Sequence, residues 1–316
     1  MKAIFKEIVS VIICTYNQED TISKTIESVL GQKVNFNLEI IIGDDCSEDN
    51  TSQICISYEK KYPGIIKYYR RKKNIGVFRN VNKCYLACNG KYIANCAGDD
   101  YYLDKQKLQK QYNFFKSNSD YGIVYSDYKI LDEASNKIVG GEAKFQNGFV
   151  FEELLKGNFI PSPTMMVKAE LVKDFIDKKK YYSELSCEDY QLILYIAQKN
   201  KIGYIKDETC VYRKNLESNG QFQDQRKKND FIDKIIQVQI IYATKNNLLD
   251  VIKSATKRYY NHVIYESINN RISFNIYKGL VNLIKIRSLN FHYLKYFIFH
   301  IFPINYCYQF FKLKHK

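Results

Sequence analysis

Strand signals and helix signals alternate through the first hundred residues, and this alternation restricts the fold more than any other feature. Residues 8–16 form an apolar, β-branched run of the kind found in strands that are buried on both faces. Directly after it, Ile22, Ile26, Val29 and Leu30 recur at the spacing of one helical face. The alternation continues through three further strand signals, and it predicts a parallel sheet with right-handed crossovers.

The rest of the chain adds a mixed region and then a helical one. The predicted fold class is therefore α/β, a Rossmann-like, mostly parallel sheet flanked by helices, with a helical C-terminal extension that starts near residue 227. We expect further strands at residues 39–45, 65–69, 91–97, 121–127 and 202–213, and helices after the turn at residues 46–51 and at residues 78–88, 107–115 and 188–197.

Polar side chains stand at the ends of three predicted strands. They are residues 15–17, the pair Asp44–Asp45 and the pair Asp99–Asp100. In open parallel sheets, ligands bind in the crevice beyond the carboxyl ends of the strands. A structural turn needs only one such residue, so the coincidence at three strand ends predicts a binding site.

The adjacent carboxylates of Asp99 and Asp100 favour a metal at this site. Two like charges side by side repel each other, and a hard divalent cation that bridges a phosphate-bearing substrate would relieve the repulsion. Oxygen ligands and an incomplete protein cage suit Mg²⁺ or Mn²⁺. The alternative is a solvated turn, since aspartate is common after strands.

Charge is spread unevenly along the 316 residues. The net charge of +14 divides into +2 for residues 1–100, zero for residues 101–200 and +12 for residues 201–316. Nucleic acid, an anionic membrane surface or a polyanionic substrate could each match such an excess. No recognised nucleic-acid-binding motif accompanies it, which argues against nucleic acid.

The C-terminal tail combines this charge with aromatic residues. Residues 251–316 hold eleven lysines and arginines against one acid, Glu266, and residues 293–311 are densely aromatic. The aromatic run is interrupted too often for a spanning helix, so we expect an interfacial segment on an anionic membrane surface. The alternative is an ordinary helix that closes the core.

Cysteine usage and the N-terminus indicate a cytosolic protein. The nine cysteines are scattered, without a Cys-x-x-Cys pair or a nearby histidine, so we expect reduced thiols and neither disulfides nor a zinc site. Glu7 interrupts the N-terminal apolar stretch, which continues as a strand without a cleavage site, so no signal peptide is expected.

Taken together, the motifs resemble the family 2 glycosyltransferases of GT-A fold. The resemblance covers about residues 8–215, with the motifs in the family's order and spacing. It rests on VSVIICTYN at residues 9–17, EIIIGDDCSEDNT at residues 39–51, NIGVFRN at residues 74–80, GKYIANCAGDD at residues 90–100 and Glu-Asp at residues 188–189.

The resemblance implies a role for each matching residue. Tyr16 would pack on the nucleotide base, and Asp45, with Asp44 beside it, would hydrogen-bond the base or ribose. Asp99 and Asp100 stand at the metal motif and would hold a divalent cation, Mg²⁺ or Mn²⁺, on the diphosphate. The implied nucleotide-sugar site as a whole comprises Thr15, Tyr16, Asn17, Asp44, Asp45, Arg79, Asn80, Asp99 and Arg213.

The same resemblance implies that Asp189 is the catalytic base. An acceptor hydroxyl is a poor nucleophile at neutral pH and needs a positioned carboxylate to take its proton. With base and leaving group on opposite faces of the sugar, displacement is in line and inverts the anomeric configuration. Taken alone, Glu188 and Asp189 would be a charge pair favoured by a helix N-terminus.

Two positions depart from the family pattern. Ala97 stands where the metal motif has its first acid, and Asn215 lies near the Tyr212–Arg213 pair, where some relatives have a histidine. The departures concern how the diphosphate is held more than the class of reaction. Taken alone, Arg213 could equally be a surface ion-pair partner.

These features predict an inverting, metal-dependent glycosyltransferase of surface polysaccharide or glycolipid assembly. We expect a UDP-sugar donor, a glycan or lipid-linked acceptor, and a cytoplasmic enzyme that is peripheral on the inner face of the plasma membrane. Residues 1–215 would form the GT-A catalytic domain and residues 216–316 a basic, helical, membrane-associated region.

Three alternative functions compete with this one, and the oxidoreductase is the one that the sequence excludes. A sugar-phosphate nucleotidyltransferase would need a glycine-rich loop after the first strand, and residues 14–19 contain no glycine. An NAD-dependent oxidoreductase fails for the same reason. A non-catalytic, basic membrane-binding protein on an inactive GT-A scaffold is argued against by the intact acids, although Ala97 speaks for it.

Overall fold

The computed structural model describes residues 7–132, 135, 137–141, 146–178, 185, 187–214 and 225–255. The chain divides into two compact units, residues 1–231 and residues 232–316. The predicted domain boundary between residues 215 and 216 lies outside the described residues, so that division stays a prediction.

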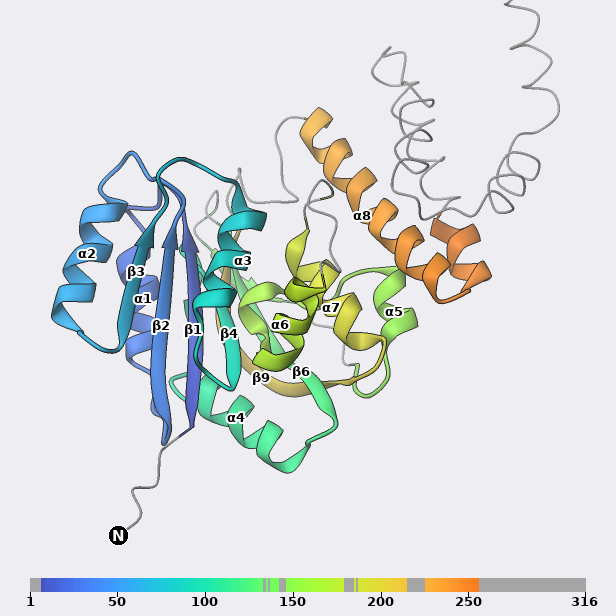
Figure 1. Ribbon diagram of the computed structural model, residues 1–316, viewed down its shortest axis with the longest axis horizontal. Coiled ribbons are helices and arrows are strands. Elements are labelled where there is room, and N and C mark those ends of the chain that lie inside the picture. Colours follow the sequence, from blue (N-terminus) through green and yellow to red (C-terminus); the bar gives the residue numbers. More distant parts are fainter. Residues whose placement is uncertain are drawn as a thin grey trace, which may run out of the picture. The chain divides into compact units, whose positions relative to one another are not determined.

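The first unit is an α/β structure built on one mixed sheet (Figure 1). Its strands are β1 (Ile8–Thr15), β2 (Asn37–Asp44), β3 (Ile66–Arg70), β4 (Tyr92–Ala97), β5 (Tyr101–Tyr102), β6 (Tyr121–Asp132), β7 (Lys137–Gly140), β8 (Met166–Lys168) and β9 (Lys201–Lys214). The described helices of the chain are α1 (Ile22–Leu30), α2 (Thr51–Lys61), α3 (Val77–Ala87), α4 (Lys107–Ser117), α5 (Phe151–Lys156), α6 (Ala169–Asp177), α7 (Glu188–Ala197) and α8 (Gln225–Lys245), with a short 3₁₀ turn at Ser162–Thr164.

The sheet joins a parallel half to an antiparallel extension. Its strand order is β3-β2-β1-β4-β8-β6-β9-β5, with β7 paired to β6. The first four strands in this order are parallel, as the alternating signals predict, and β6 and β9 are also parallel to each other. Strand β8 runs antiparallel to both β4 and β6 and so connects the two halves. The predicted α/β fold class is confirmed.

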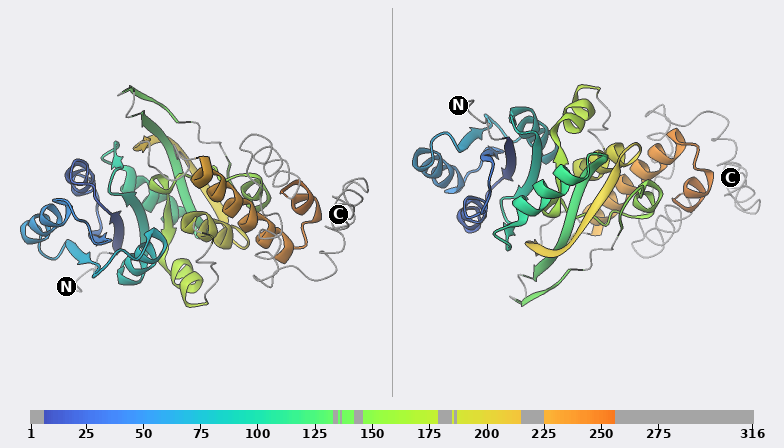
Figure 2. Two further views of the ribbon diagram at one scale, coloured as in Figure 1. Left: turned by 90° about the horizontal axis from the view of Figure 1, so that it is seen from above. Right: turned by 90° about the horizontal axis from the view of Figure 1, so that it is seen from below.

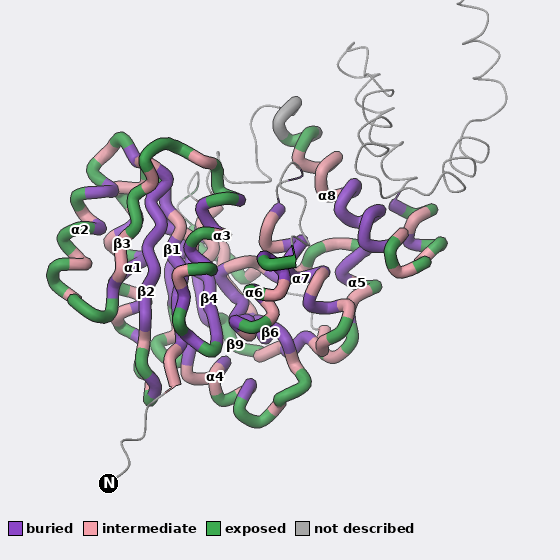
Figure 3. Tube along the Cα trace, viewed as in Figure 1, coloured by how far each residue is buried: buried purple, intermediate pink, exposed green. Residues whose placement is uncertain are grey.

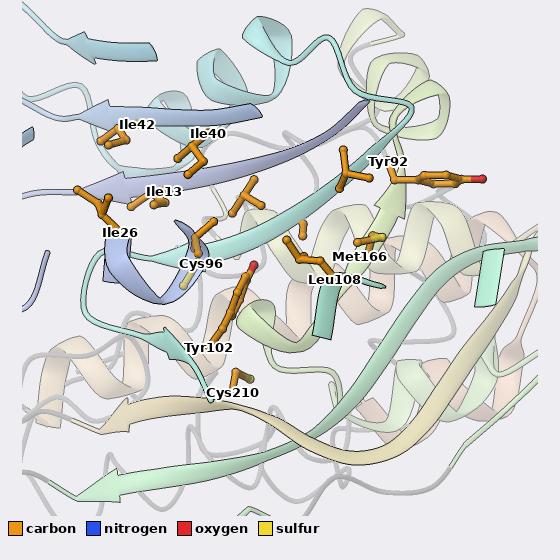
Figure 4. Packing of buried hydrophobic residues seen from close by; sticks show 14 of the residues in the cluster. Ile13, Ile26, Ile40, Ile42, Tyr92, Cys96, Tyr102, Leu108, Met166 and Cys210 are labelled. Carbon is orange, nitrogen blue, oxygen red and sulfur yellow. The ribbon is translucent and has the colours of Figure 1, made fainter. Parts of the chain in front are cut away.

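Helices cover both faces of the parallel half (Figures 1 and 2). Helices α1, α2 and α4 pack on one face, where Ile26 of α1 meets Ile13 and Ile42 of the strands (Figure 4). Helix α3 packs on the other face, where Cys84 lies 3.7 Å from Cys14, sulfur to sulfur. The central strands are therefore buried along most of their length (Figure 3).

Element predictions agree with the structure wherever periodicity extends over a long segment. The helix predicted at residues 188–197 has those bounds, and the predicted strand at residues 202–213 runs from Lys201 to Lys214. The elements that were not predicted are mostly short, among them the two-residue β5 and the three-residue β8. Strands of that length contain too few residues to show alternation.

The helical signal after residue 227 is confirmed as far as the structure describes it, by α8. The basic aromatic tail at residues 256–316 lies outside the described residues, so its predicted interfacial role stays a prediction. Within the described part of the chain, no helix is both long enough and apolar enough to cross a membrane. The eight cysteines in that part are free thiols.

Candidate active site

The register of the parallel strands places the predicted site residues along one edge of the sheet. Thr15 of β1 pairs with Asp44 of β2, and Cys14 pairs with Ala97 of β4. Two further backbone bonds extend the pairing beyond the strands, from the Asp45 N–H to the Thr15 carbonyl and from the Gly98 N–H to the Cys14 carbonyl, both at 3.0 Å. The three polar segments therefore begin beside one another, at the carboxyl ends of β1, β2 and β4.

Asp44 is fully buried, and its carboxylate is bonded inside the protein. One carboxylate oxygen accepts the Ser47 hydroxyl at 2.6 Å, and the other accepts the hydroxyls of Ser52 and Tyr68 at 2.6 Å each. Burial alone would raise the pKa of Asp44, but these hydrogen bonds outweigh it and hold the pKa below its ordinary value. Asp44 thus anchors the turn after β2, and contact with a nucleotide stays a prediction for it.

Asp45 is also buried, and it shapes the next loop. Its two carboxylate oxygens accept the backbone N–H groups of Ile75 and Gly76, at 2.8 Å each. Gly76 has a φ of 85°, a left-handed conformation that suits glycine and ends the loop where α3 begins. A carboxylate has about four acceptor positions. Asp45 therefore keeps capacity to bond a ligand at this edge.

The segment after β1 carries an exposed aromatic ring. Tyr16 is 42% exposed. Asn17, with a φ of 51°, accepts the Glu48 N–H at 2.8 Å through its side-chain oxygen, which ties this loop to the one after β2. The Thr15 hydroxyl donates to Gln18 at 2.8 Å. Tyr16 is thus the side chain of this segment that is free to pack on a flat ligand.

Two predicted residues at the start of α3 have different surroundings. Asn80 is buried, donates to the Gly43 carbonyl and accepts from the Arg71 guanidinium, both at 2.8 Å. Arg79 is exposed. Asn80 therefore fixes α3 against β2, and Arg79 is the member of the pair with access to a ligand.

Asp99 and Asp100 lie in the tight turn that joins β4 to β5. Asp100 is almost fully buried, and its carboxylate accepts the Arg213 backbone N–H at 2.8 Å. The Arg213 side chain donates from Nε to the Asp99 carbonyl, also at 2.8 Å. Burial, followed by the charge of Asp99, raises the pKa of Asp100 well above its ordinary value. The structure thus brings Arg213, which lies in β9, to the predicted acidic pair.

This pair fits a cation that a substrate helps to hold. A second negative charge beside buried Asp100 is unfavourable, and a bound cation would remove that penalty. Within the described residues, no group of three or more histidine, cysteine or acidic side chains could hold a metal by itself. Mg²⁺ is typically held by one or two carboxylates together with substrate phosphates, which matches what Asp99 and Asp100 offer.

Glu188 and Asp189 open α7 directly after Cys187, whose φ of 58° turns the chain sharply. Burial, followed by the charge of Asp189, raises the pKa of Glu188 to about 7. Burial also raises the pKa of Asp189, although the Tyr190 N–H donates to its carboxylate at 2.7 Å. Raised pKa values of this kind suit groups that exchange protons near neutral pH.

The charges of these acids contribute to the pKa values of groups in β1 and α3. The pKa of the Cys14 thiol is raised by its hydrogen bond to Cys84 and by burial, and the charge of Glu188 raises it further. The buried Tyr85 of α3 senses both acids in the same way, after the larger effects of its own burial. That Asp189 lies opposite the acidic turn therefore stays a prediction.

Several residues that hold the site were not predicted. Ser47, Ser52 and Tyr68 fix Asp44, and Thr21 and Thr25 of the α1 region donate to the turn before Asp99. For Thr25 a signal was present, because a threonine stands among the buried apolar positions of an amphipathic helix. No signal marks Tyr68 in a chain with 28 tyrosines.

Known proteins match the strands and loops that carry most of these residues. Residues 10–175, just over half of the chain, match the family model described as Glycosyl transferase family 2. An uncharacterized protein of Mycobacterium tuberculosis is 27% identical over 225 residues, which are 69% of this chain and 62% of that protein. The chain therefore spans less than two thirds of this relative.

Two named proteins are also similar to the chain. The minor teichoic acid biosynthesis protein GgaB of Bacillus subtilis is 29% identical over 263 residues, which are 78% of this chain and 27% of that protein. The crystal structure of S. aureus TarS 1–349 in complex with UDP-GlcNAc has a TM-score of 0.62 and 19% identity, and the match covers 87% of this chain and 79% of that one. At that identity the structural match shows the fold.

Asp44→Asn should destabilise the protein, because an amide places N–H donors against hydroxyl donors in a buried site. We expect a loss of about 1–3 kcal/mol in the free energy of unfolding at pH 7, measured by urea denaturation. The pKa of Asp44 is lowered in the folded state, so its contribution is present at neutral pH and is lost as the pH falls through that pKa. The difference between variant and wild type should therefore shrink in acid.

The control for Asp44→Asn is Asp20→Asn, at an exposed aspartate in the loop after β1. It should change the free energy of unfolding by less than about 0.5 kcal/mol at any of these pH values. Equal effects of the two substitutions would contradict the anchoring role of Asp44.

Proposed function

The chain belongs to glycosyl transferase family 2, and on that basis we propose that it is an inverting glycosyltransferase that moves a sugar from a UDP-sugar to a hydroxyl of a glycan or lipid-linked acceptor. One observation carries the proposal. An acidic turn held by Arg213 and an exposed tyrosine follow neighbouring parallel strands at their carboxyl ends, which is where sheets of this kind bind ligands.

The donor's nucleotide would bind at the ends of β1 and β2. Tyr16 offers a ring to the base, and Asp45 has acceptor positions left for the base or ribose. Asn17 and Asp44 would contribute indirectly, by holding the loops after β1 and β2 in place. The UDP-GlcNAc complex of TarS supports a uridine nucleotide for this fold.

The diphosphate would lie over the turn after β4. Asp99 and Asp100 would hold a divalent cation there, which when bound would neutralise charge on the leaving group. Arg213 adds a positive charge at the same turn, and its backbone N–H and Nε group orient the two aspartates. Arg79, exposed at the start of α3, would be a further cation for the phosphates.

Asp189 would accept the proton of the attacking hydroxyl. Its pKa is raised by burial, and it would be ionised before Glu188, because the charge of Asp189 is itself one of the causes that raise the pKa of Glu188. An ionised base beside a neutral acid avoids repulsion within the pair. Attack by the hydroxyl from the face of the sugar opposite the diphosphate would invert the configuration of the anomeric carbon.

The acceptor would belong to the cell envelope. Similarity to a teichoic acid biosynthesis protein supports an envelope polymer or its lipid-linked precursor. The predicted cytoplasmic location and the contact with an anionic membrane would bring the enzyme to such acceptors. A nucleotidyltransferase is disfavoured both by the family and by the absence of glycine between residues 14 and 19.

The first test asks whether a nucleoside diphosphate needs a cation to bind. Isothermal titration of UDP into the protein with Mn²⁺ should give an affinity at least about tenfold higher than in EDTA. Asp99→Asn should bring the two affinities together, whereas Asp104→Asn, an acid a few residues further on, should preserve the difference. Equal UDP affinity with and without Mn²⁺ in the wild type would refute the metal role.

The second test identifies the base. Asp189→Asn should lower the transfer rate about 10²–10⁴-fold while UDP affinity stays near that of the wild type. In the wild type, kcat should fall in acid as the base takes up a proton, at a pH below about 7 because Asp189 is ionised before Glu188.

Glu188→Gln is the matched control for this second test. It should keep the acid limb of the kcat profile, because the proton acceptor is still present. A limb at about pH 7 that disappears in Glu188→Gln would instead assign the base to Glu188.

The third test concerns the membrane. The net charge of +10 over residues 251–316 should attract anionic lipid by up to about 1 kcal/mol per well-placed cation. We expect the full chain to sediment with anionic vesicles more than with neutral ones, and a chain truncated after Arg287 to sediment less. If both proteins are recovered in the supernatant with either kind of vesicle, the tail does not bind membranes.

A further inference from the structure

A stripe of polar side chains runs along one side of α1 and continues into the residues that flank the helix. Its members are Thr21, Thr25, Ser28 and Gln32, at intervals of four, three and four residues, which is the spacing of one helical face. We call these residues the α1 polar stripe. Each of them bonds to the backbone of the segment at residues 98–104.

The bonded groups in that segment are spaced by two residues. One helical turn advances about 5.4 Å and two extended residues about 6.6 Å. Successive turns of the helix therefore lie opposite every second residue of the segment. Thr21 Oγ1 donates to the Gly98 carbonyl at 2.9 Å, Thr25 Oγ1 to the Asp100 carbonyl at 2.6 Å, Ser28 Oγ accepts from the Tyr102 N–H at 3.0 Å, and Gln32 Nε2 donates to the Asp104 carbonyl at 2.8 Å.

Thr25 is the member that serves the acidic turn. It is fully buried, and its hydroxyl lies 2.6 Å from the Asp100 carbonyl oxygen and 3.0 Å from that of Gly98. The other contact to the Asp100 carbonyl is Cys96 Sγ at 3.7 Å, and a thiol is a weak donor. Removal of the Thr25 hydroxyl would leave the buried Asp100 carbonyl poorly satisfied.

The turn is thus held from two sides. Thr21 and Thr25 bond the carbonyls of Gly98 and Asp100, and Arg213 bonds the Asp99 carbonyl between them. Three successive peptide units are fixed in this way, and together they set the directions in which the two aspartate side chains leave the backbone.

We propose that Thr25 is a positioning residue for Asp99 and Asp100, and that it transmits the placement of α1 to the two carboxylates without touching donor or cation. This inference rests on the proposed function, because it assigns a ligand to the acidic pair. Its consequence is specific. Loss of the hydroxyl should weaken cation-dependent nucleotide binding more than loss of the part-buried bonds of Gln32 at the other end of the α1 polar stripe.

The test compares three substitutions. Thr25→Val removes the hydroxyl and keeps the shape, and Thr25→Ser keeps the hydroxyl. Gln32→Met removes the bonds at the far end of the α1 polar stripe, to the Asp104 carbonyl and from the Leu108 N–H. In titrations of UDP with Mn²⁺, Thr25→Val should weaken binding about tenfold, whereas Thr25→Ser and Gln32→Met should stay within about twofold of the wild type. UDP binding in EDTA should change little in all three.

A second measurement needs no ligand. The Arg213 N–H is bonded to the Asp100 carboxylate, and the Asp100 N–H is bonded to the Ala97 carbonyl, at 2.8 and 3.0 Å. Hydrogen exchange at these two amides should be faster in Thr25→Val than in Gln32→Met when both are compared at equal global stability. A merely structural role for Thr25 would not single out these amides.

The results distinguish failure of the positioning role of Thr25 from failure of the proposed function. A folded Thr25→Val that binds UDP with Mn²⁺ as tightly as the wild type, and exchanges these amides at the wild-type rate, would overturn the positioning role. A wild type that binds no UDP would refute the proposed function, and the exchange rates would still decide whether Thr25 fixes the turn. If Thr25→Val does not fold, Thr21→Val tests the same turn from a half-buried position.

Discussion

The site depends on the register of β1, β2 and β4, because this register makes the three strands end beside one another. Pairing of Thr15 with Asp44 and of Cys14 with Ala97 aligns three loops that are far apart in sequence. The register itself is determined by burial, because a shift of one residue would turn Ile13 and Ile42 away from α1. The hydrophobic core and the polar edge are therefore two results of one alignment.

From this edge, each loop is held by bonds that come from elsewhere in the fold. Asp45 holds the loop before α3, Asn17 joins the loops after β1 and β2, and Arg213 reaches the turn after β4 from the last strand. Side chains that resemble ligand-binding residues in sequence thus divide into two kinds. Some, such as Tyr16, are exposed beside these loops, and others, such as Asp44 and Asn17, hold the loops in place.

Much of this could be predicted from sequence, and the limits have physical reasons. The strand and helix order and the strand-end acids follow from local periodicity, which the sequence shows directly. The division of labour between Asp44 and Asp45 does not, because it depends on Ser52 and Tyr68, whose proximity to Asp44 is a product of the tertiary fold. The same holds for Arg213, which meets Asp100 across more than a hundred residues. The aromatic tail stays at the level of prediction.

The bonds around Asp44 have a consequence for the energetics of recognition. A loop that a ligand must order loses conformational entropy on binding, and this loss reduces affinity. Here the Ser47 hydroxyl, the Asp44 carboxylate and the Asn17 side chain already join the two loops in the free protein. A nucleotide that binds here, as we propose, would meet preorganised loops, so most of the contact energy of its base and ribose could appear as affinity.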